Sequence, residues 1–280
     1  MIINKIKEIL LFKSSLDLKK EWSDNLYPTG PISLDYIEEL YSKYRIDLIA
    51  VRKYQRSHYK KFIGPTRSAY GDIECELTYL FLREMVPNTV VEISPWFGWS
   101  TSWILHALRD NGSGYLYSYD QLVDFPWSDA SPSMQLPCLS TLPEELMDGR
   151  FILTEGDVRQ QTNIPDSIDY LFIDSEHTSD FAKWFIKTLF PRIKKGSVTS
   201  VHDIEGNGYN DDFLAGTPYK TNPGENGEDR KVLDYLKSSN INFFHTAVFL
   251  NEIRKIRKTK GIKGTIRKNY VSMTLFFKHP

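Results

Sequence analysis

The sequence predicts a doubly wound α/β domain with a mostly parallel sheet, preceded by a helical segment. Short apolar strands alternate with helical patterns between residues 89 and 201. This alternation indicates βαβ units, whose crossovers are right-handed. Several strands are followed by acidic or histidine residues, and ligands bind at the carboxyl ends of the strands in such sheets. A chain of 280 residues has room for one large domain, or for one domain plus an appendage.

Each element follows from the apolar spacing and from the turn residues between elements. Residues 1–70 have a helical pattern, and residues 73–86 form an apolar helix that ends before Pro87. The strands expected next span residues 89–94, 115–119, 151–154, 168–173 and 197–201, with helices over 100–109 and 179–190. A helix over 228–238 precedes strands over 242–250 and 270–278, which could pair as an antiparallel hairpin. We therefore expect a helical extension or cap over 1–71 and a Rossmann-like, seven-stranded domain over 72–280, with an antiparallel C-terminal strand.

Composition and charge disfavour several classes of protein. The net charge of −1 gives no electrostatic bias toward nucleic acid or membranes. No apolar run is long enough to span a bilayer, and the short amphipathic helix expected over residues 1–12 is too charged for a signal peptide. Cys75 and Cys138 are too few for a disulfide framework, so we interpret them as free thiols and expect a cytoplasmic protein.

The turn after the first strand has the sequence EISPWFGWS over residues 92–100. A dinucleotide site would need G-x-G-x-x-G, so that backbone amides can approach a pyrophosphate. Only Gly98 is present, and Ser94 and Trp96 would crowd a diphosphate. The turn therefore disfavours NAD and FAD as cofactors.

The same turn resembles motif I of class I S-adenosylmethionine-dependent methyltransferases, which has the pattern E/D-x-G-x-x-x-G-x-S. Glu92, Gly98 and Ser100 match the pattern, whereas Ser94 replaces its first glycine. The resemblance implies that the backbone around residues 94–98 cradles the methionine part of S-adenosylmethionine. It also implies that Glu92 helps to hold the amino-acid end of that cofactor. The alternative is a structural role, in which a buried Glu92 caps the helix that follows.

Two acidic residues after later strands continue the resemblance. Asp120 ends the second strand, where Rossmann-like folds place a carboxylate that accepts hydrogen bonds from a ribose diol. Asp157 follows the third strand, and the resemblance implies that it meets the adenine amino group, with Glu155 as the competing acceptor.

Asp174 and His177 follow the fourth strand, and His202 and Asp203 follow the fifth. These segments resemble sugar and small-molecule O-methyltransferases of the macrocin O-methyltransferase type, and the resemblance covers about residues 73–250. Asp174 and Asp203 are the candidate ligands of Mg²⁺, which prefers oxygen, and His202 is a softer third candidate. In the relatives of the catechol type, such a metal orients the substrate hydroxyls and lowers the pKa of one. His177 is the candidate general base, and Asp174 and His202 complete the expected catalytic set. Alternatively, these aspartates cap helices and the histidines hydrogen-bond to loops.

The leading hypothesis is an S-adenosylmethionine-dependent O-methyltransferase that acts on a hydroxyl of a sugar or other polar small molecule. Two long loops, over residues 121–150 and 205–227, could select the substrate. Tyr209, Asp211 and Asp212 could face a sugar there, or the second loop could be only a surface segment.

Residues 253–268 contain eight lysines and arginines. They could bind an anionic substrate, a nucleotide-sugar, a lipid headgroup or RNA, or form a solvated connection between the last two strands. This segment favours the main alternative, a methyltransferase on RNA or protein, but the near-zero net charge disfavours it. A further alternative is a non-catalytic or repurposed binding domain, because a fold does not fix a function. We expect no nucleic-acid partner, and the chain could form a homo-oligomer.

Overall fold

The structure is a computed structural model that describes residues 31–60, 70–121, 139, 142–204, 227–246, 249–266 and 274–280. Several sequence-based predictions lie outside these residues: the helix over 1–12, Cys138, most of the loop over 121–150, and residues 205–226 with Tyr209, Asp211 and Asp212.

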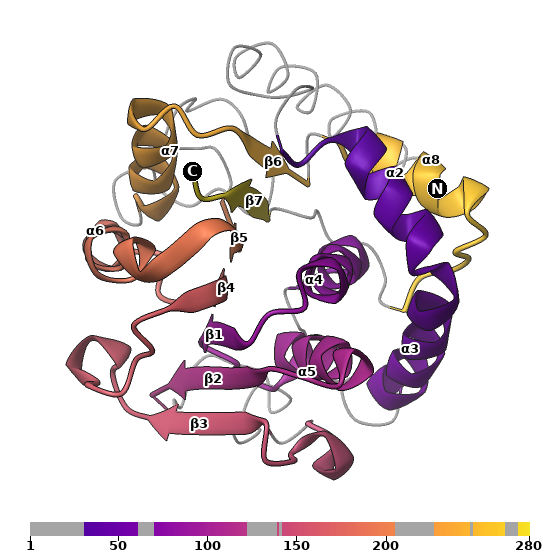
Figure 1. Cartoon of the computed structure of the whole chain (residues 1–280), viewed down its shortest axis with the longest axis horizontal. Coiled ribbons are helices and arrows are strands. Elements are labelled where there is room, and N and C mark those ends of the chain that lie inside the picture. The colour runs from indigo at the N-terminus through magenta and orange to yellow at the C-terminus, as the bar shows by residue number, and fades with distance from the viewer. Residues whose placement is uncertain are drawn as a thin grey trace, which may run out of the picture.

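A seven-stranded sheet forms the centre of the molecule, with strand order β3-β2-β1-β4-β5-β7-β6 (Figure 1). The strands are β1 (Thr89–Ile93), β2 (Tyr115–Asp120), β3 (Phe151–Glu155), β4 (Ile168–Ile173), β5 (Ile193–Val201), β6 (Phe243–His245) and β7 (Leu275–Lys278). The strands β1 to β5 pair in parallel, whereas β7 runs antiparallel to both β5 and β6. The predicted fold class, including the antiparallel C-terminal strand, is confirmed.

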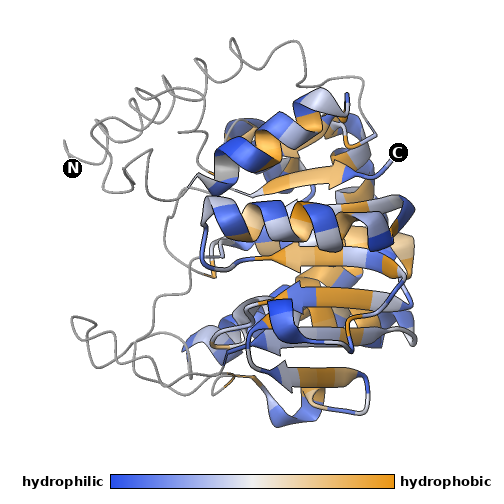
Figure 2. Cartoon of the chain, turned by 90° about the vertical axis from the view of Figure 1, so that its left-hand side faces the viewer, coloured by the Kyte–Doolittle hydropathy of each residue, from blue (hydrophilic) through white to orange (hydrophobic). Residues whose placement is uncertain are grey.

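Helices cover both faces of this sheet. One face carries α4 (Asp72–Met85) and α5 (Trp99–Asn111), and the other carries α6 (Ser179–Thr188) and α7 (Glu228–Ser238) (Figure 1). Figure 2 shows hydrophobic strands behind helices whose visible faces are largely hydrophilic, as expected for helices that bury one side. Throughout the described ranges, every helix is too short or too polar to cross a bilayer.

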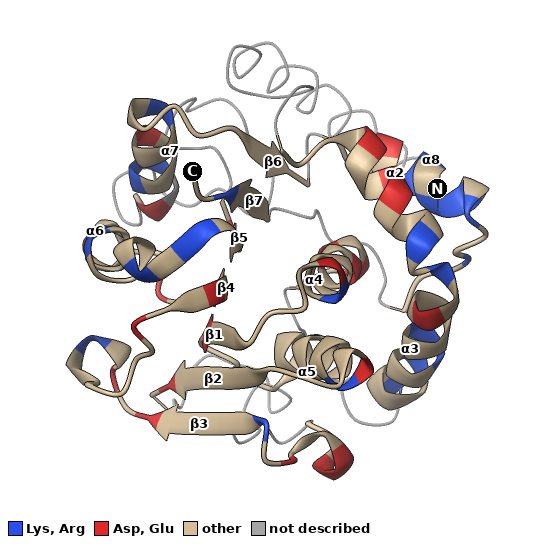
Figure 3. Cartoon of the chain, in the orientation of Figure 1, with Lys and Arg blue, Asp and Glu red and all other residues tan. Residues whose placement is uncertain are grey.

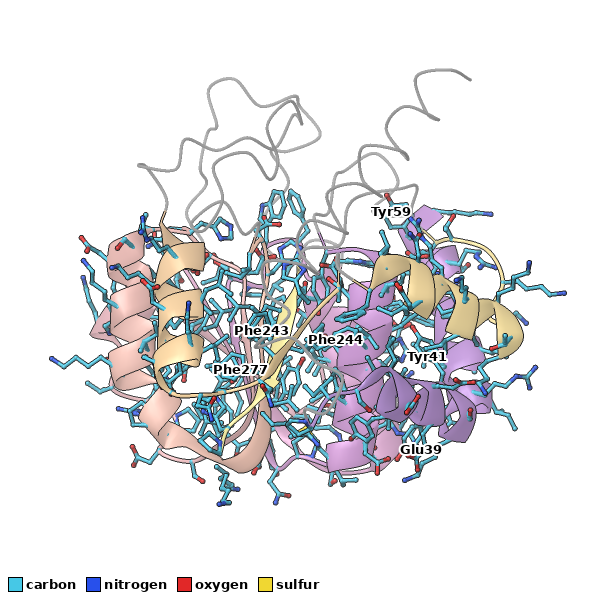
Figure 4. The ribbon with its side chains drawn as sticks, turned by 90° about the horizontal axis from the view of Figure 1, so that it is seen from above. Glu39, Tyr41, Tyr59, Phe243, Phe244 and Phe277 are labelled. Carbon is cyan, nitrogen blue, oxygen red and sulfur yellow. The ribbon has the colours of Figure 1, made fainter. Side chains whose placement is uncertain are left out.

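A further layer of helices lies outside α4. It consists of α2 (Leu34–Lys43), α3 (Arg45–His58) and α8 (Leu250–Thr259) (Figure 1). Helix α2 contacts both α4 and α8, and its buried Tyr41 lies in this layer, whereas Phe243 and Phe277 lie in the central sheet (Figure 4). The helical pattern predicted before residue 70 is thus present over residues 34–58, packed on the domain. The division at residue 71 stays a prediction.

The start of the basic segment is helical, which corrects the prediction of a strand over 242–250 and a solvated connection after it. The strand ends at His245, and α8 begins at Leu250. Ile253 and Ile256 are buried and lie three residues apart, so they form an apolar stripe on one side of the helix. Arg257 is buried beside them. The many cations around these residues hide that stripe in the sequence. Figure 3 shows the positively charged α8 beside acidic residues of α2.

Glu76 of α4 is the centre of a buried ionic cluster between these helices. Its Oε1 accepts a hydrogen bond from Arg257 Nη2 at 2.9 Å, and its Oε2 lies 2.8 Å from Arg257 Nε. The Tyr41 hydroxyl donates to Glu76 Oε2 at 2.8 Å, and Arg52 of α3 forms an ion pair with the same carboxylate. Arg52 also lies 3.9 Å from Asp72. One carboxylate therefore joins α2, α3, α4 and α8.

Candidate active site

The carboxyl ends of the five parallel strands meet at one edge of the sheet. Ile93, which ends β1, pairs with Tyr119 of β2 and with Ile173 of β4, and Ile173 pairs in turn with Val201 of β5. The candidate residues predicted from the sequence lie in or after these strand ends: Glu92, Ser94, Gly98, Ser100, Asp120, Asp157, Asp174, His177, His202 and Asp203.

The turn after β1 contains three residues in the left-handed conformation, namely Ser94 (φ 65°), Trp96 (φ 47°) and Gly98 (φ 88°). Ser94 stands where motif I has glycine, and its positive φ explains the preference for glycine there. Serine adopts this conformation at a cost of about 1 kcal/mol. The Ser94 N–H donates to the Tyr119 carbonyl at 2.8 Å. A Cβ at residue 98 would approach Leu142 Cβ to 3.0 Å, so this position also requires glycine.

Asp120 and Asp157 lie at the neighbouring ends of β2 and β3. The Asp120 carboxylate accepts the Trp96 N–H at 3.1 Å, which ties the turn after β1 to the end of β2. Asp157 accepts the Arg159 N–H at 2.9 Å and pairs with its guanidinium at 2.8 Å. These hydrogen bonds from Arg159 lower the pKa of Asp157, so its carboxylate is an ionised acceptor near neutral pH. The contacts of the two aspartates with the ribose and the adenine stay predictions.

Glu92 is fully buried beneath this turn. Its carboxylate accepts hydrogen bonds from the hydroxyls of Ser100 at 2.7 Å, Thr101 at 2.9 Å and Ser118 at 2.6 Å. Glu92 thereby links the start of α5 to β2. This structural role is close to the alternative that Glu92 caps the following helix, but the donors are side-chain hydroxyls and not backbone amides. Burial raises the pKa of Glu92 to about 7, although the three hydroxyls oppose this rise. The contact of Glu92 with the cofactor stays a prediction.

Replacing Glu92 by glutamine should remove a pH dependence of stability. The pKa of Glu92 rises from 4.5 to about 7 on folding, so its contribution to stability is complete below pH 4.5 and lost as the pH rises toward 7. The difference corresponds to about 3 kcal/mol. We expect urea denaturation to show the free energy of unfolding of Glu92→Gln rising relative to wild type between these pH values. A difference that does not change with pH would contradict the assignment.

Three candidate residues form a compact group of donor atoms. Asp174, His177 and Asp203 each offer one atom that could bind a metal ion, and these three atoms lie within 4.8 Å of one another. His177 Nε2 is 3.9 Å from Asp174 Oδ1 and 3.7 Å from Asp203 Oδ2. His177 (φ 54°) and Asp203 (φ 56°) both have the left-handed conformation, an unfavourable state that is often found at functional sites. No other such group occurs in the parts of the chain that the structure describes.

His202 lies beside this group and is buried. Its Nδ1 is 3.2 Å from Asp174 Oδ1 and 3.3 Å from Asp203 Oδ1, and its Nε2 is 3.7 Å from Glu74 Oε1. Burial alone would lower the pKa of His202, but the surrounding carboxylates raise it to about 10. The ring of Tyr70 packs edge-on against the imidazole, with centroids 5.2 Å apart. The imidazolium is thus a counter-charge for the two aspartates.

Two buried glutamates that were not predicted from the sequence contact the histidines. Glu228 Oε2 lies 2.7 Å from His177 Nδ1, and Glu74 faces His202. Burial alone would lower the pKa of His177, but Glu228, Asp174 and Asp203 raise it to about 9. Glu74 is an acidic residue within the apolar helical pattern over 73–86, and this unusual position is a signal in the sequence that could have marked it. Glu228 resembles any acidic residue in the first turn of a helix.

Comparison with known proteins gives one match to a family model and a set of similar solved structures. Residues 91–204 match the family model described as "Methyltransferase domain". The O-methyltransferase TomG from Streptomyces achromogenes, solved with SAM, is 16% identical over 82% of this chain and 89% of its own, with a TM-score of 0.50. A putative caffeoyl-CoA O-methyltransferase from Staphylococcus aureus is 15% identical over 85% of this chain and 99% of its own, with a TM-score of 0.51. An O-methyltransferase from Bacillus cereus, in complex with SAH, is 14% identical over 94% of this chain and 97% of its own, with a TM-score of 0.50. No curated protein sequence matches the chain.

The family match covers the part of the chain that carries every cofactor, metal and catalytic residue predicted from the sequence. The solved structures support the fold. Together they confirm the predicted resemblance: residues 91–204 resemble a methyltransferase domain, and the solved structures share the Rossmann-like fold of this chain.

Proposed function

We propose that this protein transfers the methyl group of S-adenosylmethionine to a hydroxyl oxygen of a polar small molecule, such as a sugar. The observation that carries this proposal is the group formed by Asp174, His177 and Asp203. A hydroxyl must lose its proton to accept a methyl group, and imidazole and carboxylate side chains are suited to that step. The similar solved structures of O-methyltransferases support oxygen as the acceptor atom.

The cofactor residues follow from the turn and the strand ends. S-adenosylmethionine supplies a methyl group that is already activated as a sulfonium, so the protein needs chiefly to bind and to orient. In our proposal, the backbone of residues 94–98 holds the methionine part and Asp120 accepts hydrogen bonds from the ribose diol. Asp157 accepts the adenine amino group. Glu92, joined to Ser100, keeps the turn and the start of α5 in place and helps to hold the amino-acid end.

A divalent cation would fit beside the acceptor hydroxyl. Asp174 and Asp203 offer carboxylate oxygens, which suit Mg²⁺, the ion proposed from the sequence. Such a cation would orient the hydroxyl and lower its pKa. His177 could act as general base or as a third ligand, and both roles would use Nε2. His202 would balance the charge of the aspartates from its buried position.

The packing of α8 supports a small molecule over RNA or protein as the substrate. Arg257 is buried against Glu76, and Lys260 forms an ion pair with Glu38 of α2 at 2.7 Å. These two cations of the basic segment are thus already paired within the chain. We also propose the cytoplasm as the location, because two cysteines are too few for the disulfide framework of a small secreted protein.

Isothermal calorimetry with S-adenosylmethionine and S-adenosylhomocysteine tests the proposal, with and without Mg²⁺. We expect wild-type protein to bind both compounds and Asp120→Ala to bind them about 10- to 100-fold more weakly, because a charged hydrogen-bond acceptor is lost. Asp120→Asn is the matched control for the turn, since an amide oxygen can still accept the Trp96 N–H. Failure of the wild-type protein to bind either compound would refute the proposed function.

A further inference from the structure

Glu228 is a buried carboxylate beside the candidate site. It is the first residue of α7, its side chain is 2% exposed, and its Oε2 lies 2.7 Å from His177 Nδ1. Its other oxygen, Oε1, has no hydrogen-bond partner among the residues that the structure describes. Burial of a charge is costly without compensation, so a buried carboxylate in this state needs a reason. The imidazole of His177 is the partner that the structure provides.

The backbone holds Glu228 and His177 together from both sides. Gly227 precedes Glu228 and Thr178 follows His177, and these two neighbours form an antiparallel β-bridge. Gly227 has φ 69°, and a Cβ there would lie 3.3 Å from Ser179 Cβ, so only glycine fits without strain. His177 itself has φ 54°. The contact between the two side chains is therefore fixed by the local chain path.

This contact decides which nitrogen of His177 faces the aspartates. Nδ1 is engaged by Glu228, so Nε2 is the atom 3.9 Å from Asp174 Oδ1 and 3.7 Å from Asp203 Oδ2. The two aspartates are partly exposed, at 24% and 32% of their side chains, so an ion can reach them. A carboxylate that holds one nitrogen while the other points at a cation is the usual support of a metal-binding histidine.

We propose that Glu228 is a positioning residue that holds His177 as the nitrogen ligand of a divalent-cation site completed by Asp174 and Asp203, and that this site prefers Mn²⁺ or Co²⁺ to Mg²⁺. The inference rests on the proposed function, whose cation it specifies. Mg²⁺ demands oxygen ligands, whereas imidazole nitrogen favours transition metals, in the order Mn²⁺ below Co²⁺. In this assignment, His177 is a ligand of the cation and the general-base role falls away.

Metal titration of the full-length, chelator-treated protein tests this proposal without any acceptor. Free Mn²⁺ is measured by electron paramagnetic resonance, Co²⁺ by its visible absorption, and Mg²⁺ by calorimetry. We expect wild-type protein to bind Mn²⁺ more tightly than Mg²⁺. His177→Ala should abolish that preference and leave the Mg²⁺ affinity nearly unchanged. Glu228→Leu should weaken Mn²⁺ binding about 10- to 100-fold, as expected for loss of a supporting carboxylate.

Conservative variants separate positioning from simple loss of structure. Glu228→Gln keeps an oxygen that can accept the Nδ1 hydrogen, so it should recover most of the Mn²⁺ affinity. If Glu228→Leu does not fold, Glu228→Asp retracts the carboxylate by one methylene and should weaken Mn²⁺ binding instead. Asp180→Asn, a nearby carboxylate outside the group, is the matched control and should bind both ions as wild type does. Thermal melting of each variant shows which of them are folded.

The outcomes also separate this inference from the proposed function. Calorimetry with S-adenosylhomocysteine, run in parallel, reports on the cofactor site alone. Wild-type protein that binds S-adenosylhomocysteine but shows no preference for Mn²⁺ would overturn the metal assignment and leave the proposed function standing. A folded Glu228→Leu or Glu228→Asp variant with wild-type Mn²⁺ affinity would overturn the positioning role. Absence of S-adenosylhomocysteine binding would instead count against the proposed function.

Discussion

The variant Glu76→Ala is expected to lose about 3–5 kcal/mol of stability, because it leaves buried charges without their partner. Arg52 and Arg257 both form ion pairs with the Glu76 carboxylate, and their side chains are 4% and 9% exposed. Burial lowers the pKa of Arg52 to about 10, so the guanidinium stays charged at neutral pH. Urea denaturation would measure the loss.

An exposed ion pair on the same helix provides the control for this prediction. Glu84 lies 2.7 Å from Lys43 of α2, whose side chain is 53% exposed. Exposed pairs contribute about 0–1 kcal/mol, so Glu84→Ala should cost far less than Glu76→Ala. Replacing Arg52, Glu76 and Arg257 together by Met, Leu and Met should also cost less than Glu76→Ala alone, because both guanidinium charges are removed together with the carboxylate that they share. Equal losses for Glu76→Ala and Glu84→Ala would contradict the central role of Glu76.

The variant Asp174→Ala is expected to lose methyl transfer by about 100-fold or more while it keeps its affinity for S-adenosylmethionine. Asp174 Oδ1 lies 3.2 Å from His202 and 3.9 Å from His177. Its loss would disturb both histidines and remove one candidate cation ligand. The rate would be measured as transfer of a labelled methyl group to the best acceptor in a panel of sugars and catechols. Calorimetry with S-adenosylhomocysteine would report on the cofactor site.

Glu176 provides a matched control within the same loop. This carboxylate lies between Asp174 and His177 in the sequence, but it contacts Arg159 and Thr178 instead. Glu176→Gln should therefore leave the rate of methyl transfer close to that of wild type. If the two variants have similar rates, or if Asp174→Ala also loses cofactor affinity, the assignment of Asp174 to the chemical step is wrong.

Much of the fold was predictable because its elements are locally consistent. The strands β1 and β4 are short, apolar and bounded by turn residues, so their positions follow from pattern alone. The region after β6 was not predictable in this way. Its apolar residues Ile253 and Ile256 are separated by cations, so the charge pattern masked a helix that packs on α2. The early start of β5, at Ile193, was missed because lysines and a glycine precede its apolar part.

Site residues could be predicted only where an acidic or histidine side chain follows a strand directly. Asp174, His177 and Asp203 follow β4 and β5 directly, and parallel strands in register bring such residues together. Glu74 and Glu228 come from helices, and only the tertiary structure brings them to the histidines. The positive φ of Ser94 could not be inferred from a serine, although the resemblance to motif I marks that position as one that favours glycine.

The ionic cluster at Glu76 also bears on the order in which the chain can fold. Glu76 and Arg257 are separated by 181 residues, and Glu74 accepts a hydrogen bond from Thr274, 200 residues away. During synthesis, α4 therefore emerges from the ribosome long before Arg257 and Thr274, two of the partners of its acidic residues, exist. Contacts between such distant residues form slowly, because loop closure must precede them. Helix α4 cannot be buried with all of these contacts formed until α8 and Thr274 have been made, so completion of the fold depends on residues late in the chain.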